Sequence, residues 1–343
     1  MHRDSLVIVT PALADANNGN WQTARRWARL LSPAYRVRLV AQWPEASADE
    51  GTPKTPGLML ALHARRSAAS IAAWRAAHAS APLVVALTGT DLYRDIDSDA
   101  SAQRSLELAD ALIVLNELGA QRLPPALRAK CRLVLQSCSQ RQTLAKPEGP
   151  GSRLRAVMVG HLRGEKDPRT LFEAVRQLGP RMGRGGDLRV DHIGRALDPA
   201  LGEAAQALAT QWPGYRWLGG QTHEQARRRI QAANVLVHTS RMEGGAHVVM
   251  EAVRSGTPVI ASHIDGNVGL LGADYPGYFP PGDAAGLARL LERAQEDRGW
   301  LHTLASAAAQ RAPLFAPEAE RQALMNVLAG AQTMVQSTAP ARS

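Results

Sequence analysis

Two glutamates eight residues apart, with a glycine turn between them, are the residues best suited to chemistry in this sequence. Glu243 stands directly before Gly244 and Gly245, and Glu251 lies inside the helix expected to follow. A glycine turn that opens a helix presents backbone N–H groups and the positive end of the helix dipole, which bind anions. A nearby carboxylate does not bind phosphate and is better suited to sugar hydroxyls, like the ribose-reading acid of nucleotide sites. We therefore expect the turn to bind an anion and the carboxylates to bind a sugar.

The segments around these glutamates predict a strand, a turn, a helix and a second strand. The apolar run 235–238 is typical of a buried parallel strand, 246–254 of a helix, and 258–262 of the next strand. His247 lies four residues before Glu251, on the same helix face. A common strand–turn–helix unit with two surface acids is the alternative. Spacing, glycine turn and flanking strands all agree, and together they favour a binding site at the carboxyl end of a strand.

Length and composition indicate a folded protein with two domains. The chain has 343 residues, of which 45% are hydrophobic and 21% charged. No apolar run approaches the roughly eighteen residues of a membrane span, so we expect no integral membrane segment. The N-terminus leads straight into a strand, so we expect no signal peptide. The only cysteines, Cys131 and Cys138, fit reduced thiols and a cytoplasmic location better than a disulfide framework or a metal site.

The charge balance is basic, with a net charge of +9 and a pI of about 10.2. A basic balance attracts nucleic acid, acidic lipid or phosphorylated small molecules. The charge is spread along the chain, and no basic run with interleaved aromatic residues marks a nucleic-acid surface. We therefore expect small anionic substrates and no nucleic acid.

Strands and helices alternate in two series, which predicts an α/β fold of two Rossmann-like domains facing each other across a cleft. The expected strands of the first series are 6–10, 37–41, 58–62, 83–87 and 111–115, and those of the second are 156–159, 189–193, 215–218, 235–238 and 258–262. A polar Pro/Gly-rich segment at 145–153 is the best linker candidate. The predicted parts are an N-terminal domain 1–146, a C-terminal domain 152–315, a terminal helix 316–335 crossing back to the first domain, and a tail 336–343.

Three strand ends of the first domain carry polar residues that would face the cleft. They are, in chain order, Asn18, Gly19, Asn20, His63, Arg65, Arg66, Thr90 and Asp91. Two guanidinium groups beside the titratable imidazole of His63 suit a small anion. A solvated helix start explains Arg66 equally well, and an N-cap explains Asp91 equally well. We take these residues except Gly19 as the candidate acceptor site, and Gly19 as a candidate donor-binding residue.

The motif around Glu243 and Glu251 resembles the Glu-x7-Glu signature of nucleotide-sugar glycosyltransferases with the GT-B fold. The resemblance implies that Glu251 holds the donor ribose and that Glu243 lies near the transferred sugar. It also implies that the amides of Gly244 and Gly245 hold the donor diphosphate, with His247 beside them.

Residues 159–168 resemble the Gly-Arg-Leu-x3-Lys loop of the same family, whose arginine and lysine neutralise the leaving diphosphate. Lys166 matches the lysine. His161 stands where the family has its arginine, and Arg163 follows two residues later, which leaves open the identity of the second cation. Gly19 matches the family's glycine loop near the reacting centre. With these cations at hand, we expect neither a metal nor a cofactor.

Several stretches together resemble the selenosugar synthases of selenoneine biosynthesis. They are 17–20, 62–67, 87–93, 160–168 and 242–249. The resemblance implies transfer of N-acetylglucosamine from UDP-GlcNAc to selenophosphate, with formation of a carbon–selenium bond. A selenolate needs little help from a base, so the catalytic task is positioning and leaving-group stabilisation. Glu243, Lys166, His161 and His63 are the catalytic candidates.

Three other hypotheses for the function stay open. A conventional GT-B glycosyltransferase would act on a carbohydrate or lipid hydroxyl, with the arginine-bearing helix at 21–31 lying on an anionic membrane. A phosphorylase-like enzyme with pyridoxal phosphate would need a Schiff-base lysine, and the chain has few lysines. A non-catalytic nucleotide-binding regulator would not need both Glu243 and Lys166.

Overall fold

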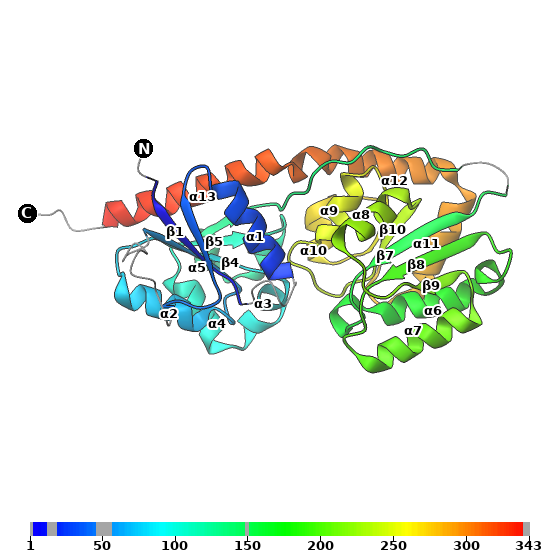
Figure 1. Cartoon of the computed structure of the whole chain (residues 1–343), viewed down its shortest axis with the longest axis horizontal. Helices are drawn as coiled ribbons and strands as arrows, with labels where there is room; N and C mark the ends of the chain where they lie inside the picture. The colour runs from blue at the N-terminus through cyan, green and yellow to red at the C-terminus, as the bar shows by residue number, and fades with distance from the viewer. Residues whose placement is uncertain (1–2, 12–18, 46–56, 148–150, 339–343) are drawn as a thin grey trace, which may run out of the picture. The chain divides into compact units, whose positions relative to one another are not determined.

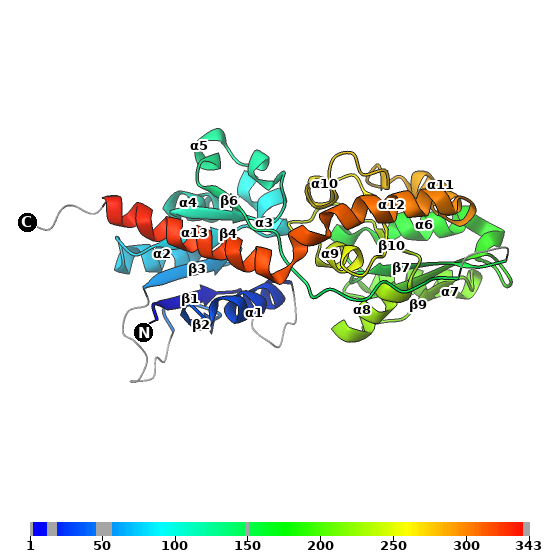
Figure 2. The same cartoon turned by 90° about the horizontal axis from the view of Figure 1, so that it is seen from above.

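The computed structural model of the chain describes residues 3–11, 19–45, 57–147 and 151–338. The chain divides into two compact units, each built on its own parallel sheet (Figures 1 and 2). The first unit consists of Met1–Gln136 and Pro317–Ser343, and the second of Ser137–Ala316.

The sheet of the first unit has six parallel strands in the order β2-β1-β3-β4-β5-β6. They are β1 (Ser5–Val9), β2 (Arg36–Val40), β3 (Leu58–Leu62), β4 (Leu83–Ala86), β5 (Ala111–Val114) and β6 (Cys131–Leu133). β3 and β4 are buried along their whole length, as expected for parallel strands covered on both faces. The order reverses between β1 and β3. In open parallel sheets, ligands bind beyond the carboxyl ends of the strands at such a switch point.

Helices cover both faces of this sheet. They are α1 (Gly19–Leu31), α2 (Ala68–Ala77), α3 (Gly89–Tyr93), α4 (Ala100–Leu108), α5 (Pro125–Arg128) and α13 (Pro317–Thr338), with 3-10 turns η2 (Asp95–Asp97) and η3 (Gly119–Arg122). Alternate strand residues point to opposite faces. On one face, Trp27 of α1 and Leu328 of α13 pack in a core with Ile8. On the other face, Trp74 of α2 packs in a core with Val7.

A buried carboxylate joins the C-terminal helix α13 to α1. Glu320 is 1% exposed, and it accepts hydrogen bonds from Trp27 Nε1 at 2.6 Å and from Arg26 Nε at 2.9 Å. The arginine-bearing helix thus uses Arg26 and Trp27 for packing within the unit, and Arg25 and Arg29 are exposed. Because Arg26 is bonded to Glu320, it is not available to an anionic membrane, which argues against the hypothesis that α1 is a membrane-surface helix. None of the described helices is long and apolar enough to cross a bilayer.

The sheet of the second unit also has six parallel strands, in the order β12-β11-β10-β7-β8-β9. They are β7 (Leu154–Val159), β8 (Leu188–Ile193), β9 (Tyr215–Trp217), β10 (Val235–His238), β11 (Val259–Ser262) and β12 (Tyr278–Phe279). Numbered within the unit, this is the 3-2-1-4-5-6 order of a dinucleotide-binding sheet. Its switch point lies between β7 and β10, so the loops that leave these two strands flank the expected ligand site. The short edge strand β12 was not predicted from the sequence.

The helices of the second unit connect these strands. They are α6 (Pro168–Leu178), α7 (Pro199–Gln211), α8 (His223–Ala232), α9 (His247–Val253), α10 (Asp265–Leu271), α11 (Ala284–Glu296) and α12 (Arg298–Arg311), with 3-10 turns η4 (Gly164–Lys166), η5 (Gly179–Met182) and η6 (Ala312–Phe315). A capping box between Thr222 and Gln225 starts α8. That cap fixes the position of His223, the first residue of α8.

The segment 137–147 packs on the second unit, although the sequence placed the end of the first domain at residue 146. The guanidinium of Arg227 donates hydrogen bonds to the side chain and carbonyl of Ser139 at 2.7 and 2.6 Å. The backbone N–H of Arg141 donates to the carbonyl of Arg254 at 3.0 Å. These contacts come from residues distant in sequence, so local composition does not reveal them.

Candidate active site

The centre of the site in the second unit is an ion pair between the two loops at the switch point. Lys166 Nζ lies 2.5 Å from Glu243 Oε1, and the side chains are 18% and 13% exposed. His238, the last residue of β10, places Nε2 3.5 Å from the same oxygen. Burial alone would raise the pKa of the Glu243 carboxyl, but the Lys166 ammonium and His238 hold it well below its usual range. Glu243 is therefore a carboxylate at neutral pH, able to accept hydrogen bonds from hydroxyl groups but not to act as a general acid.

The loops that carry this pair are tied to each other. The hydroxyl of Thr239 donates to the carbonyl of Lys166 at 2.7 Å, and Arg241 Nε donates to Asp167 Oδ2 at 3.0 Å. Asp167 adopts the left-handed conformation, with φ 45°, which turns the chain directly after Lys166 into α6. Such a sparsely populated conformation costs free energy and persists where surrounding contacts hold it.

Gly266 at the start of α10 packs directly beneath Glu243. A Cβ atom at position 266 would lie 2.2 Å from the Glu243 carbonyl oxygen and 2.8 Å from its Cβ. Only glycine allows this approach of the two backbones, so Gly266 helps to fix the direction of the Glu243 side chain. Gly266 could not be identified from the sequence, because it lies 15 residues beyond Glu251 and contacts Glu243 only in the folded chain.

His161 is not suited to be the second cation of the site. Its Nδ1 accepts a hydrogen bond from the backbone N–H of Arg195 at 3.1 Å. Burial, followed by the charges of Arg195, Arg163 and Lys166, lowers its pKa. A neutral imidazole bonded in this way can donate from Nε2 but adds no positive charge. The role of His161 in catalysis stays a prediction, and Arg163 and Arg195, both exposed, are the guanidinium groups whose charges act on His161 together with that of Lys166.

Glu251 lies on the inner face of α9, and its side chain is only 3% exposed. Its Oε1 faces His223 Nε2 at 2.5 Å, His247 Nδ1 at 3.2 Å and Arg227 Nε at 3.7 Å. Burial would raise the pKa of Glu251, but hydrogen bonds from His223 and His247 lower it to about 2. The carboxylate is thus ionised and pre-positioned. His223 was missed from the sequence, because it comes from α8 and is near Glu251 only in the folded chain.

The predicted anion turn lies between β10 and α9. The helix begins at His247, and its N-cap residue Ala246 supplies no side-chain hydrogen bond to the first turn. Gly244 and Gly245 therefore lie between Glu243 and the helix start, as the sequence predicted. Whether their amides hold a diphosphate remains a prediction.

The first unit brings His63, Thr90, Asp91 and Arg66 together at the carboxyl ends of β3 and β4. His63 is 1% exposed and has a left-handed backbone with φ 71°. Its Nδ1 accepts from the backbone N–H of Arg66 at 3.4 Å, and its Nε2 lies 3.1 Å from Thr90 Oγ1. Burial lowers the pKa of His63, against the nearby charge of Asp91 and with that of Arg66. We therefore expect a neutral imidazole whose two nitrogens are both engaged.

The carboxylate of Asp91 supports the His63 turn from within. Asp91 is fully buried, and it accepts hydrogen bonds from the backbone N–H of Ala64 and the hydroxyl of Thr88, both at 2.9 Å. It lies inside α3, whose N-cap residue is Thr88, so the N-cap explanation of Asp91 is wrong. Both carboxylate oxygens of Asp91 thus accept hydrogen bonds within the loop, and its contact with an acceptor stays a prediction.

Arg65 is less available to an anion than the sequence suggested. Its Nε lies 2.8 Å from Asp95 Oδ2, and Arg94 Nε lies 2.9 Å from Asp95 Oδ1. Of the two guanidinium groups expected at this site, that of Arg65 is therefore partly neutralised by Asp95. Arg66 is exposed and forms no ion pair within the described part of the chain, so it is the stronger candidate. Asp95 was not identified from the sequence, because it lies one turn beyond Asp91 and outside the stretch 87–93.

The glycine loop of the first unit is described only in part. Gly19 and Asn20 are the first residues of α1, whereas the sequence placed them in a loop before a helix at Trp21. The hydroxyl of Thr23 donates to the Gly19 carbonyl at 2.8 Å. Asn18 lies outside the described residues.

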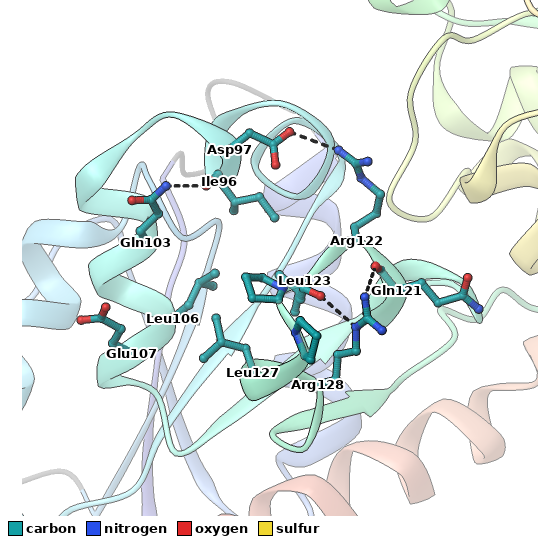
Figure 3. A pocket seen from close by; sticks show the side chains of 12 residues that line it. Ile96, Asp97, Gln103, Leu106, Glu107, Gln121, Arg122, Leu123, Leu127 and Arg128 are labelled. Carbon is teal, nitrogen blue, oxygen red and sulfur yellow. Dashed lines mark hydrogen bonds and ion pairs between the residues drawn. The ribbon is translucent and has the colours of Figure 1, made fainter.

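A separate cavity of about 540 Å³ lies among η2, α4, η3 and α5 of the first unit (Figure 3). Ile96, Leu106, Leu123 and Leu127 supply an apolar lining, and Arg122 pairs with Asp97 across 3.1 Å beside it. None of the predicted site residues lines this cavity.

The two doubly wound sheets, each with polar side chains at its switch point, define a two-domain α/β fold of the GT-B class. Known structures share it. A sucrose-phosphate synthase from Thermosynechococcus elongatus superposes with a TM-score of 0.73 at 18% identity, covering 97% of this chain and 100% of that one. The Anabaena protein HepE in complex with UDP-glucose gives a TM-score of 0.73 at 17% identity over 96% of this chain and 100% of that one. A glycosyltransferase from Rickettsia africae gives 0.73 at 12% identity, over 99% and 100%.

Residues 139–311 match the family described as glycosyl transferases group 1. The chain belongs to this family. The matched residues contain both glutamates of the motif and the loop of Lys166, so the second unit carries the family signature. No protein of curated function matches the sequence significantly.

Proposed function

We propose that this glycosyltransferase is a selenosugar synthase that transfers N-acetylglucosamine from UDP-GlcNAc to selenophosphate. The donor is assigned to the second unit, where Glu251 would hold the ribose and Lys166 the diphosphate. The acceptor is assigned to the first unit, at His63 and Arg66. A cytoplasmic location, predicted from the sequence, is part of the same proposal.

The contacts of the second unit support the donor half. Glu243 and Glu251 are both held as carboxylates, at the switch point of a sheet with dinucleotide-binding order. Glu243 is bonded through Oε1, and Lys166 presents an ammonium group between the two loops. HepE, which shares the fold, is known in complex with UDP-glucose. These points favour a uridine diphosphate sugar as the donor.

The burial and hydrogen bonds of the two candidate bases are the observations that favour one acceptor over another. A hydroxyl acceptor needs a general base near the anomeric carbon, and the sequence offered His63 and Asp91 for that role. Both are buried, and both already accept hydrogen bonds that hold the loop. An acceptor that is already anionic and strongly nucleophilic needs no such base. This favours selenophosphate over a carbohydrate or lipid hydroxyl.

In the proposed reaction the selenium of selenophosphate attacks the anomeric carbon of the donor. A carbon–selenium bond forms, the bond from that carbon to the β-phosphate oxygen breaks, and UDP leaves with the electron pair. Lys166, with a neighbouring guanidinium, would stabilise the charge that develops on the leaving diphosphate. The phosphoryl group is later removed by water, which breaks the phosphorus–selenium bond and releases phosphate.

Mass spectrometry of the products tests this proposal. The protein is incubated with UDP-GlcNAc and selenophosphate, and we expect UDP and a product with the isotope pattern of selenium. A parallel incubation with thiophosphate and with phosphate measures how far turnover depends on the nucleophile. Transfer to a sugar or lipid hydroxyl, without any selenium-bearing sugar, would contradict the selenosugar assignment and leave a conventional glycosyltransferase. Binding of UDP without transfer to any acceptor would favour a non-catalytic regulator.

A further inference from the structure

Two histidines and a glutamate of the second unit converge at the predicted ribose site. His223, His247 and Glu251 place one ligating atom each within 4.8 Å of one another. The side chains of His223 and His247 are 67% and 31% exposed, whereas that of Glu251 is 3% exposed. The group thus has a buried carboxylate and two solvent-accessible imidazoles, and the two histidines are the first residues of α8 and α9.

Two imidazoles and one carboxylate are the protein ligands of open zinc sites, in which an exchangeable water takes the fourth position. Zinc bound at about 2.0–2.2 Å by such ligands requires neighbouring ligand atoms to be roughly 3.4 Å apart. The His247 Nδ1–Glu251 Oε1 distance of 3.2 Å already meets this requirement. The His223 Nε2–Glu251 Oε1 distance of 2.5 Å must lengthen, and the exposed side chain of His223 has room to withdraw.

The outer hydrogen bond of His247 has the form found at metal ligands. Its Nε2 lies 3.1 Å from the carbonyl oxygen of Ser137. When Nε2 donates to that carbonyl, Nδ1 is the ring nitrogen that faces Glu251 Oε1, at 3.2 Å. A backbone carbonyl that orients a ligating histidine is a recurrent feature of metal sites.

Arg227 sets a limit on the affinity of this group for cations. Its Nε lies 3.7 Å from Glu251 Oε1, and Ser139 holds its guanidinium in place. A fixed positive charge behind the carboxylate weakens the binding of a second cation. We therefore expect affinity in the micromolar rather than the nanomolar range.

We propose that His223, His247 and Glu251 form a binding site for a divalent cation of the zinc class, and that a cation there excludes the donor nucleotide. The exclusion rests on the proposed function, because Glu251 cannot bind ribose hydroxyls and the cation at once. The cation is then an inhibitor and not a cofactor, in agreement with the absence of a metal from the proposed reaction.

Direct metal binding tests the site without reference to the donor. The full chain is freed of metals and titrated with Zn²⁺ by calorimetry and with Co²⁺ by visible absorbance. We expect one equivalent to bind to the wild type, and His223→Gln and Glu251→Gln to weaken binding by at least about tenfold. His302→Gln, at an exposed histidine of α12, serves as the matched control and should bind like the wild type. Circular dichroism checks that each variant is folded. Equal affinity in the wild type and both cluster variants overturns the site.

Titration with UDP in the presence and absence of zinc tests the exclusion. We expect saturating zinc to raise the apparent Kd of the wild type for UDP by at least about tenfold. The same titration of His223→Gln corrects for zinc bound by UDP in solution. Zinc bound at the cluster with unchanged UDP affinity overturns the exclusion and the ribose assignment of Glu251. UDP binding without zinc binding overturns the metal site and leaves the proposed function intact.

Discussion

The ion pair between Lys166 and Glu243 offers a sharp test of how the donor site is built, through a double-mutant cycle. The variants are Lys166→Met, Glu243→Gln and the combination of both. Each single change leaves one polar group in a site where the side chains are 18% and 13% exposed. The double change removes both charges, so it should destabilise the protein by clearly less than the sum of the single changes.

The geometry sets the expected size of the coupling. Breaking a buried ion pair costs about 3–5 kcal/mol, and an exposed pair contributes about 0.2–1 kcal/mol. The Nζ–Oε1 distance of 2.5 Å and the low exposure of both side chains place this pair nearer the buried case. We therefore expect a coupling free energy of about 2–3 kcal/mol. The matched control is the pair Arg104–Glu107, which is 2.8 Å apart with side chains 65% and 59% exposed; its coupling should stay below about 0.5 kcal/mol.

Urea unfolding of the four proteins of each cycle, followed by tryptophan fluorescence, supplies the free energies of unfolding. Added salt should lower the coupling free energy of the exposed control pair more than that of Lys166 and Glu243, because screening acts mainly on exposed charges. Coupling for Lys166 and Glu243 that is no larger than that of the control pair would refute the description of Glu243 as a carboxylate held by the Lys166 ammonium.

Three further predictions concern the acceptor, the metal and the pH dependence of stability. Arg66→Ala should raise KM for selenophosphate roughly tenfold or more through loss of a charge-assisted hydrogen bond, and should leave UDP affinity unchanged; an unchanged KM would remove Arg66 from the acceptor site. Chelation of divalent metals by EDTA should leave turnover undiminished, and activity lost in EDTA but restored by Mg²⁺ would show a metal requirement. His192 is fully buried, and burial lowers its pKa from 6.5 to about 4; because the unfolded chain takes up the proton first, stability should fall by roughly 2 kcal/mol as the pH drops from about 7 to about 4.5. His192→Phe should abolish most of this slope, which chemical unfolding at each pH measures, whereas His302→Phe should keep it.

The parts of the site that local sequence could predict are those built from one strand, one turn and one helix. The spacing of Glu243 and Glu251, with glycines between them, predicted a strand that ends at His238 and a helix that carries His247. Hydrophobic runs likewise predicted the central strands of both sheets, because parallel strands are apolar on both faces.

The residues that sequence reasoning missed act through contacts between distant segments. His223 reaches Glu251 from another helix, and Gly266 contacts Glu243 only because α10 folds beneath the β10–α9 loop. Asp95 pairs with Arg65 because of the direction in which the chain turns between them, and hydrophobic periodicity does not predict that direction. The neutral state of His161 has the same kind of origin, since it depends on burial and on Arg195 from the loop after β8. Residue type and spacing therefore identified the candidate residues, and the tertiary contacts determine which of them carry a charge.

Calorimetric titration with UDP tests the central claim, that the β10–α9 motif of the second unit holds a uridine diphosphate donor. The wild type should bind one UDP per chain. Glu251→Gln should weaken binding by about tenfold to a hundredfold, as expected for a lost hydrogen bond to a charged group. Glu318→Gln, at an exposed residue of α13, should bind like the wild type. UDP affinity that is equal in the wild type and in Glu251→Gln would contradict the assignment of this motif to the donor.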